Sequence, residues 1–475
     1  MKLYQLLSGL CYTTVNSSDR VKTTEISSIS QNSSKCDDSS LFVCIKGASA
    51  DGHSFAKDAY GKGTKAFVCE HKLDLPMDAV QIIVDSTKTA LAIISSNFYG
   101  HPEKNIKLIG ITGTKGKTSC AYMMAKILND SSRKTAVIGT CGVDLIDRTI
   151  QTANTTPGSL ELFGFLRTMC DEGFEYCVME VSSQAIKLDR IYGLHFEYAI
   201  FTNLSIDHIG VGEHKDFEEY KECKKKLFSI ADNSIINIDD QYGKEFLQAS
   251  KSACHTYSLT TDDCDMKAEK VLVEGLKTGY TVEGIRASLP FPGNYSVYNA
   301  MACILCAKQI GIETKKATDS LESVVVPGRL QIVKTKRKDV CFIIDYAHNG
   351  DSLEKLLSNL KPKNRLICLF GSVGERTQLR RKELAQAASK YADICILTSD
   401  NPNHEPPDNI TKEISGYMTT EYVVINDRTE AIKHAIDIAK EGDIVVFAGK
   451  GHEKYQLVNG VKEPFDEEAI IKEFA

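Results

Sequence analysis

The sequence predicts an α/β protein of three domains, and three observations support this. The chain of 475 residues suits two to four domains at roughly 100–200 residues each. Short apolar runs alternate with helical patterns, which predicts mostly parallel sheets covered by helices. Two breaks interrupt the alternation, His101-Pro102 and Val326-Pro327-Gly328, where proline disfavours a helix at the residue before it. We therefore expect domains at 1–101, 102–327 and 328–475.

The expected strands fall into three groups. The first domain is rich in Ser, Thr and Asp and has short strand-like runs, at 41–45 and 66–68. The second domain carries apolar strands at 106–112, 136–140, 176–181, 199–204 and 235–238. The third carries strands at 340–346, 366–371, 394–399, 423–426 and 444–448. The last two groups each predict a separate parallel sheet.

Composition excludes several classes of protein. Hydrophobic residues make up 42% and charged residues 25%, as in an ordinary globular protein. A net charge of −6 gives no general attraction to nucleic acid or to an anionic membrane. The 16 cysteines mostly stand singly in apolar runs, so we expect free thiols in a reducing cytosol. We find no targeting segment and no apolar run near the roughly 18 residues of a membrane span, and we expect a cytoplasmic monomer.

A glycine loop between a strand and a helix predicts a phosphate site. The strand ends at Thr112, and a helix with apolar residues at helical spacing runs over 117–128. Such a loop lets backbone N–H groups converge on an anion at a helix N-terminus. Lys117 would reach the outer phosphates of ATP, and Thr118 would ligate Mg²⁺. The expected ATP contacts in this loop are Gly113, Thr114, Lys115, Gly116, Lys117, Thr118 and Ser119. The alternative is a glycine-rich turn with incidental Lys and Thr; the flanking strand and helix argue against it.

Several motifs together resemble the Mur ligases, ATP-dependent amide-forming enzymes of peptidoglycan synthesis. They appear in family order along the whole chain: Thr112-Gly-Thr-Lys-Gly-Lys-Thr118, Asn154-Thr-Thr-Pro157, Glu180-Val-Ser-Ser183, Thr202-Asn-Leu204, Asp207-His208, Asn237-Ile-Asp-Asp240, Tyr298-Asn-Ala300, Gly328-Arg329 and Asp345-Tyr-Ala-His348. Within the family the chain most resembles the members that add a diamino acid as the third peptide residue. The resemblance implies a small N-terminal α/β domain that binds the UDP end, a central P-loop ATPase domain and a C-terminal Rossmann-like domain for the amino acid.

The resemblance also implies a reaction and the residues that serve it. ATP would phosphorylate a carboxylate of a UDP-N-acetylmuramoyl dipeptide, and the amine of a free diamino acid would attack the acyl phosphate. Glu180 and His208 resemble the family's Mg²⁺ ligands, beside Thr118. Lys224 aligns with the lysine that takes up carbon dioxide as a carbamate, which supports a second Mg²⁺; by charge alone, its helix would be a solvated face. Further ATP contacts would be Asn299, Arg329, Asp345 and His348. The muramyl substrate would meet Ser33, Asn154, Thr155, Thr156, Ser182 and Arg190.

The added amino acid is the finest of these expectations. Asp400-Asn401-Pro402-Asn403 follows a strand of the last domain, and in the family an Arg follows Asp-Asn-Pro when the substrate is meso-diaminopimelate. The neutral Asn403 favours L-lysine, which lacks the distal carboxylate, and the alternative substrates are diaminopimelate and ornithine. Asn403 could instead be only a turn residue, without a contact to the substrate. Arg376 is the candidate cation for the α-carboxylate of the substrate. Asp400 or Glu405 is the candidate carboxylate for its ammonium group. Asn401, Gly449 and Glu453 complete the expected contacts.

Departures from the family pattern keep other functions open. Asn32-Ser33-Ser34 stands where the family has Asp-Ser-Arg, and Gln184 replaces a common His, so the acceptor could be modified. A folate or polyglutamate ligase is one competing hypothesis. A non-catalytic ATP-binding protein is another, which the presence of Lys117, Glu180 and His208 disfavours.

Overall fold

The computed structural model describes all of residues 1–475 except 16–17, 48–49, 208, 211–212, 252 and 376–377. The chain divides into two compact units. One consists of Met1–Lys267 with Met301–Ala317, and the other of Ala268–Ala300 with Thr318–Ala475. Each unit is described by itself.

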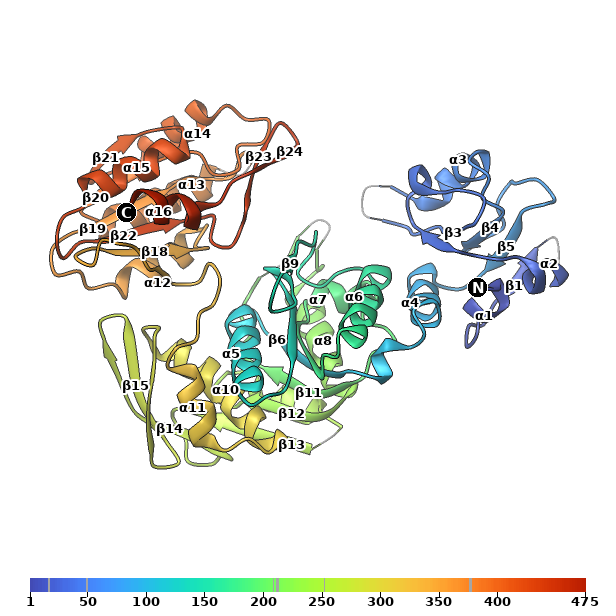
Figure 1. The fold of residues 1–475 in the computed structure, drawn as a ribbon, viewed down its shortest axis with the longest axis horizontal. Helices are drawn as coiled ribbons and strands as arrows, with labels where there is room; N and C mark the ends of the chain where they lie inside the picture. Colours follow the sequence, from blue (N-terminus) through green and yellow to red (C-terminus); the bar gives the residue numbers. More distant parts are fainter. Residues whose placement is uncertain (16–17, 48–49, 208, 211–212, 252, 376–377) are drawn as a thin grey trace. The chain divides into compact units, whose positions relative to one another are not determined.

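The first sheet lies near the N-terminus and runs in the order β1-β5-β4-β3-β2 (Figure 1). Its strands are β1 (Thr13–Val15), β2 (Ser28–Ser30), β3 (Ser40–Val43), β4 (Ala66–Cys69) and β5 (Val80–Ile83). Its helices are α1 (Leu3–Leu6), α2 (Ser18–Thr23), α3 (Ala56–Gly61) and α4 (Thr87–Phe98), with 3₁₀ turns η1 (Ser33–Lys35), η2 (Gly52–Phe55) and η3 (Pro102–Lys104). Alternate residues of β3 enter different clusters: Leu41 and Val43 pack on one face, and Phe42 packs on the other. Both faces are therefore covered, which explains why the strand is apolar throughout.

The central sheet carries the phosphate loop. Its parallel part runs in the order β13-β12-β11-β6-β10-β7, and β8 and β9 continue it with antiparallel pairing. The strands are β6 (Lys107–Thr112), β7 (Thr135–Gly139), β8 (Gly142–Asp144), β9 (Thr149–Ile150), β10 (Tyr176–Glu180), β11 (Phe196–Phe201), β12 (Ala231–Asn237) and β13 (Ala253–Ser258). The helices are α5 (Lys117–Asp130), α6 (Ser159–Asp171), α7 (Ser183–Lys187), α8 (Phe217–Lys225) with η4 (Lys226–Ser229), α9 (Gly243–Ala249), α10 (Asn294–Ile310) and α11 (Thr314–Leu321).

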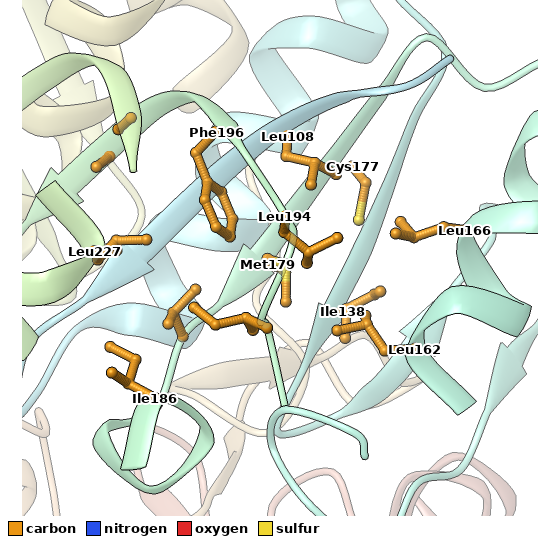
Figure 2. Packing of buried hydrophobic residues seen from close by; sticks show 14 of the residues in the cluster. Leu108, Ile138, Leu162, Leu166, Cys177, Met179, Ile186, Leu194, Phe196 and Leu227 are labelled. Carbon is orange, nitrogen blue, oxygen red and sulfur yellow. The ribbon is translucent and has the colours of Figure 1, made fainter. Parts of the chain in front are cut away.

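One face of this sheet is covered by a continuous apolar cluster (Figure 2). On α6 the buried residues Leu162, Leu166 and Met169 recur at helical spacing, so one stripe of the helix faces the sheet. They pack with Cys177 and Met179, which alternate along β10 toward the same face. This packing fixes β10 beside β6, so that the ends of both strands meet at one edge.

The last sheet runs in the order β17-β18-β22-β19-β20-β21. Its strands are β17 (Gln331–Val333), β18 (Cys341–Asp345), β19 (Leu366–Phe370), β20 (Ile394–Leu397), β21 (Glu421–Val424) and β22 (Ile444–Ala448), all parallel except β17. Its helices are α12 (Gly350–Ser358), α13 (Gln378–Tyr391), α14 (Pro407–Ser415), α15 (Arg428–Ile438) and α16 (Glu467–Phe474). The same unit holds the hairpin β23 (Tyr455–Val458) and β24 (Val461–Pro464), and the strands β15 (Lys277–Val282) and β16 (Ile285–Leu289). These two strands form an antiparallel sheet with β14 (Met266–Glu274), whose first two residues pair in parallel with β13.

The predicted α/β class and the buried strands are confirmed within a residue or a few at each end. The antiparallel strands β8, β9, β14, β15 and β16 were not predicted, because short or half-exposed strands leave a weak apolar signal. Across the described residues, no helix combines the length and the apolar character needed to cross a membrane.

Candidate active site

The phosphate loop joins β6 to α5, as predicted, and two of its glycines have positive φ. Gly113 has φ 150°, and a Cβ added there would lie 2.0 Å from the Thr202 hydroxyl. Gly116, with φ 88°, caps α5. Both positions therefore need glycine, one for lack of space and the other for its backbone conformation.

The end of β11 holds this loop in place. Thr202 Oγ1 donates to the Lys115 carbonyl at 2.8 Å. The Asn203 carboxamide bonds both the N–H and the carbonyl of Lys115, each at 3.0 Å, and its own backbone carbonyl accepts from Thr114 N at 2.9 Å. The motif Thr202-Asn-Leu204 thus fixes, by hydrogen bonds, the loop that carries the predicted ATP contacts.

Two lysines converge on one backbone carbonyl of the loop. Lys117 Nζ donates to the Gly113 carbonyl at 2.8 Å, and Lys224 Nζ donates to the same oxygen at 2.9 Å. Lys224 is only 1% exposed, so the expectation of a solvated helix face is wrong at this residue. Burial, and then the nearby Lys117 ammonium, hold the pKa of Lys224 well below its usual range. Such an amine is available in its neutral form, which is the nucleophilic one.

Glu180 ends β10 and is 1% exposed, not a solvated strand-end carboxylate. Its two oxygens accept from Thr140, one from the backbone N–H at 2.9 Å and one from the hydroxyl at 3.1 Å. A Cβ at Gly139 would lie 2.3 Å from Glu180 Oε1, so glycine there makes room for the carboxylate. The side chain is therefore fixed in one orientation.

The side chains available as metal ligands suit Mg²⁺ better than a metal ion that is bound by protein side chains alone. The described residues contain no group of three His, Cys, Asp or Glu side chains that could hold a metal ion. Glu180 and the buried hydroxyl of Thr118 offer oxygen ligands, and Mg²⁺ commonly uses one or two carboxylates together with substrate phosphates and water. His208, the other expected ligand, lies outside the described residues.

The predicted muramyl contacts gather partly around Glu180. Thr156 Oγ1 donates to the Glu180 carbonyl at 2.8 Å and accepts from Ser182 N at 3.1 Å, and Arg190 Nη1 donates to the Thr156 carbonyl at 2.9 Å. Burial lowers the pKa of Arg190. Thr155 shares a hydroxyl contact of 3.2 Å with Thr140. Asn154 is exposed, and Ser33 belongs to η1, in the N-terminal part of the chain.

The remaining predicted ATP contacts belong to the second unit. Asp345 is buried at the end of β18; its oxygens accept from Leu330 N at 2.7 Å and Ala347 N at 2.8 Å, and burial raises its pKa. The Arg329 guanidinium lies 4.7 Å from the centre of the Tyr346 ring. His348 Nδ1 contacts the Tyr346 carbonyl at 2.8 Å, and burial lowers the pKa of this imidazole. Asn299, on α10, is 6% exposed.

The predicted amino-acid contacts surround a buried lysine that the sequence had not singled out. Lys450 is fully buried, and its Nζ donates to Asn401 Oδ1 at 2.8 Å and to Glu453 Oε2 at 2.9 Å. Asp400 Oδ1 lies 3.7 Å from the same nitrogen, and this oxygen accepts no hydrogen bond although the side chain is 2% exposed. A Cβ at Gly449 would lie 3.0 Å from the other Asp400 oxygen. Asp400, Asn401, Gly449 and Glu453 thus form one network.

Asn403 and Glu405, by contrast, are held by other parts of the chain. Asn403 has φ 52°; its Oδ1 accepts from Gly460 N at 2.9 Å and its Nδ2 donates to Glu375 at 2.8 Å. Glu405 receives both arms of the Arg381 guanidinium, at 2.9 and 2.6 Å, and this ion pair lowers the Glu405 pKa. Asn403 therefore fits the turn alternative, and Glu405 already has a cationic partner in Arg381, which it shares with Glu413. Arg376 lies outside the described residues.

A pocket of about 340 Å³ lies beside this turn, and its lining includes none of the partners of Lys450. Asn403 and Glu405 line it, together with Asn426, Thr429 and Gln456, whereas Asp400 and Glu453 do not. The pocket therefore includes two of the predicted amino-acid contacts, Asn403 and Glu405, and lies outside the Lys450 network. Besides Lys450, sequence analysis missed Thr140. Its position directly after β7 could have indicated it, because β7 and β10 are parallel and therefore end at the same edge of the sheet.

Comparison with known proteins gives consistent matches along the chain. Residues 25–99 match the Mur ligase family catalytic domain, residues 111–307 the Mur ligase middle domain, and residues 328–451 the Mur ligase glutamate ligase domain. The UDP-N-acetylmuramoyl-L-alanyl-D-glutamate–2,6-diaminopimelate ligase of Clostridium perfringens is 40% identical over 99% of this chain and 99% of its own length. The ligase of the same name from Clostridium botulinum is 41% identical over 100% and 99%.

Solved structures agree with these matches. A structure titled as a UDP-N-acetylmuramoyl-L-alanyl-D-glutamate–2,6-diaminopimelate ligase is 26% identical, covers 100% of this chain and 98% of its own, and has a TM-score of 0.69. A MurF structure from Acinetobacter baumannii is 18% identical, covers 94% and 95%, and has a TM-score of 0.64; at this identity it supports the fold alone.

Proposed function

The chain belongs to the Mur ligase family, and from that premise we propose that it joins meso-diaminopimelate to UDP-N-acetylmuramoyl-L-alanyl-D-glutamate. As a member of this family it is a ligase that forms a carbon–nitrogen bond with the use of ATP. The proposal for the amino acid is supported by the names of relatives that are 36–41% identical over nearly the whole chain. These names do not support the preference for L-lysine that Asn403 suggested.

One observation carries the catalytic part of the proposal. Lys224 is buried beside the phosphate loop, donates to the Gly113 carbonyl that Lys117 also contacts, and has a pKa well below its usual range. An aqueous lysine would be protonated and inert toward carbon dioxide, whereas this amine can form the carbamate that the family resemblance implies. The N–H that remains after carbamylation can keep the bond to Gly113.

The reaction then proceeds in two balanced steps. The side-chain carboxylate of the D-glutamate residue attacks the γ-phosphorus of ATP, which forms the acyl phosphate and releases ADP. An amine of diaminopimelate attacks the acyl carbon, phosphate leaves, and the nitrogen loses a proton to give the amide. The loop N–H groups and Lys117 would bind and orient the phosphates, and the group around Thr156 and Arg190 would orient the carboxylate.

Glu180 and Thr118 would hold Mg²⁺, with His208 and the Lys224 carbamate as further proposed ligands. The metal, when bound, would neutralise the phosphate oxygens during transfer. The pairing of Glu180 with Thr140 keeps the carboxylate aimed before any ligand arrives. We extend the proposal to the second unit, where Asn299, Arg329, Asp345 and His348 would contact ATP.

The network around Lys450 is the proposed amino-acid site. Asp400 Oδ1 is a buried acceptor without a hydrogen bond, and an ammonium group of the substrate would satisfy it. The argument for L-lysine rested on an amide at position 403 facing the substrate. Because both ends of the Asn403 amide are bonded to other parts of the chain, Gly460 and Glu375, its neutrality carries little information about the distal carboxylate.

A phosphate-release assay tests the proposal. The full-length protein, ATP, Mg²⁺ and bicarbonate are mixed with UDP-N-acetylmuramoyl-L-alanyl-D-glutamate and equimolar meso-diaminopimelate, L-lysine and ornithine, and the products are separated by mass. We expect the diaminopimelate product to predominate. Predominant lysine or ornithine product would overturn the choice of amino acid, and no product with any of them would overturn the proposed acceptor.

A further inference from the structure

A single buried aromatic ring links the phosphate loop to Lys224. Tyr220 lies on α8 one turn before Lys224 and is 0% exposed. Its hydroxyl and that of Thr114 are 3.1 Å apart, and Lys224 Nζ lies 4.6 Å from the centre of its ring. The His214 ring meets it edge-on, with centroids 5.4 Å apart, and His214 Nε2 contacts the Ser183 hydroxyl at 2.9 Å. The phosphate loop and Lys224 thus both contact Tyr220, and the segment after Glu180 is linked to it through His214.

Each contact restricts a group that would otherwise have several positions. Lysine has a flexible four-carbon stem, and a ring four residues earlier on the same helix face limits where its nitrogen can lie. Thr114 belongs to the loop, and its hydroxyl also accepts from Ser205 N at 3.0 Å. The hydroxyl of Tyr220 therefore connects the helix that carries Lys224 to the loop that carries the predicted ATP contacts.

We propose that Tyr220 is a positioning residue, which holds Lys224 and the phosphate loop in a fixed relation to each other. The ring seats the Lys224 side chain, and the hydroxyl fixes Thr114. The inference rests on the proposed function, in which the phosphates and the carbamate must be at the correct separation.

Two substitutions separate the two halves of this role. Tyr220→Phe keeps the ring and removes the hydroxyl, so we expect the dissociation constant of a non-hydrolysable ATP analogue with Mg²⁺ to rise about three- to tenfold, with little effect on Lys224. Tyr220→Met keeps an apolar side chain and removes the ring, so we expect kcat to fall about 10²-fold because the Lys224 group is misplaced. In ¹³C-bicarbonate, the Lys224 carbamate resonance of Tyr220→Met should shift relative to wild type, because the neighbouring aromatic ring is gone.

Phe217 provides a matched control on the same helix. Its ring packs 5.3 Å from Tyr242 and 6.2 Å from Tyr220, one turn farther from Lys224. Phe217→Leu should lower thermal stability without changing nucleotide affinity, kcat or the carbamate resonance. Equal losses in Phe217→Leu, or wild-type affinity and kcat in both Tyr220 variants, would overturn the inference and leave a purely structural role.

Failure of the inference can be told apart from failure of the proposed function. If wild type shows no carbamate resonance and no amide product, the proposed function fails. The nucleotide affinity of Tyr220→Phe still tests the link to Thr114 in that case, because it requires neither the muramyl substrate nor the amino acid. Wild-type affinity there would remove the remaining support for a positioning role.

Discussion

Lys224 and Lys450 are the same residue type at the same burial, 1% and 0% exposed, in different compact units. Lys224 donates to a backbone carbonyl and lies near a second ammonium, that of Lys117. Lys450 is ion-paired with Glu453 at 2.9 Å, is 3.7 Å from Asp400, and donates to Asn401. Burial near another cation favours the neutral amine, whereas burial among carboxylates favours the ammonium. The comparison teaches that the surroundings, not burial alone, decide whether a buried lysine is a reactive amine or a fixed cation.

Removal of the Lys224 amine should give the largest effect. We expect Lys224→Ala to lose about 10²–10³-fold in kcat, the size seen when one preorganised electrostatic group is lost at an active site. Acetate should restore part of the activity by occupying the anionic position. Lys225→Ala is the control, because Lys225 pairs with Glu222 at 2.6 Å on the partly exposed side of α8. Equal losses at both positions would indicate a general effect of charge and would break the comparison.

Removal of the Lys450 ammonium should instead destabilise the fold. Lys450→Met leaves the buried Asp400 and the partly buried Glu453 without their cation, and loss of one partner of a buried pair typically costs about 3–5 kcal/mol in the free energy of unfolding. Urea denaturation followed by circular dichroism measures this. Lys390→Met, which removes an exposed ion pair with Glu354, should cost no more than about 1 kcal/mol. Similar small costs for both variants would mean that Lys450 is not the cation on which this network depends.

The depressed pKa of Lys224 gives its effect on the pH dependence of stability a definite sign. The pKa of Lys224 lies well below the ordinary value of 10.5, so between these values the unfolded chain binds a proton that the folded protein does not. Its contribution therefore makes wild type more stable as pH rises, until the pH passes the unfolded value. In buffer free of carbon dioxide, Lys224→Met should be more stable than wild type near neutral pH, with a difference that narrows toward pH 10.5. A difference that widens with pH would contradict the depressed pKa.

The smallest effect is expected at Asn403, at the border of the Lys450 network. Its φ of 52° and its two side-chain bonds predict that Asn403→Ala costs about 1–2 kcal/mol, and that Asn403→Gly, which tolerates this backbone, costs less. Neither variant should change the ratio of diaminopimelate to lysine product more than a few-fold. A large change in that ratio would show that Asn403 contacts the substrate after all, and would extend the amino-acid site beyond the network around Lys450.

The parts of the site that sequence predicts best are local. The phosphate loop was found because strand, glycines, lysine and helix follow one another within about a dozen residues, and periodicity identifies the flanking elements. The buried strands were found for the same reason. The phosphate loop at Thr112–Thr118 could thus be identified without knowledge of distant contacts.

The electrostatic surroundings of the two lysines could not be predicted in this way. Lys224 stands in a run with Lys221, Lys225 and Lys226 that is typical of a solvated helix face, and only its packing near Gly113, 111 residues earlier, buries it. The partners of Lys450 include Asn401, 49 residues away. Family resemblance singled out Lys224 and was silent on Lys450. The family resemblance thus predicted a role for Lys224, whereas only the contacts in the structure revealed Lys450.

Carbon-13 NMR in ¹³C-bicarbonate tests the central contrast between the two lysines most directly. The wild-type protein, Lys224→Met and Lys450→Arg, which keeps a cation in the acidic network, are compared at equal concentration and pH. We predict one carbamate resonance in wild type, its loss in Lys224→Met, and its retention in Lys450→Arg. Absence of the resonance in wild type, or its persistence in Lys224→Met, would contradict the account.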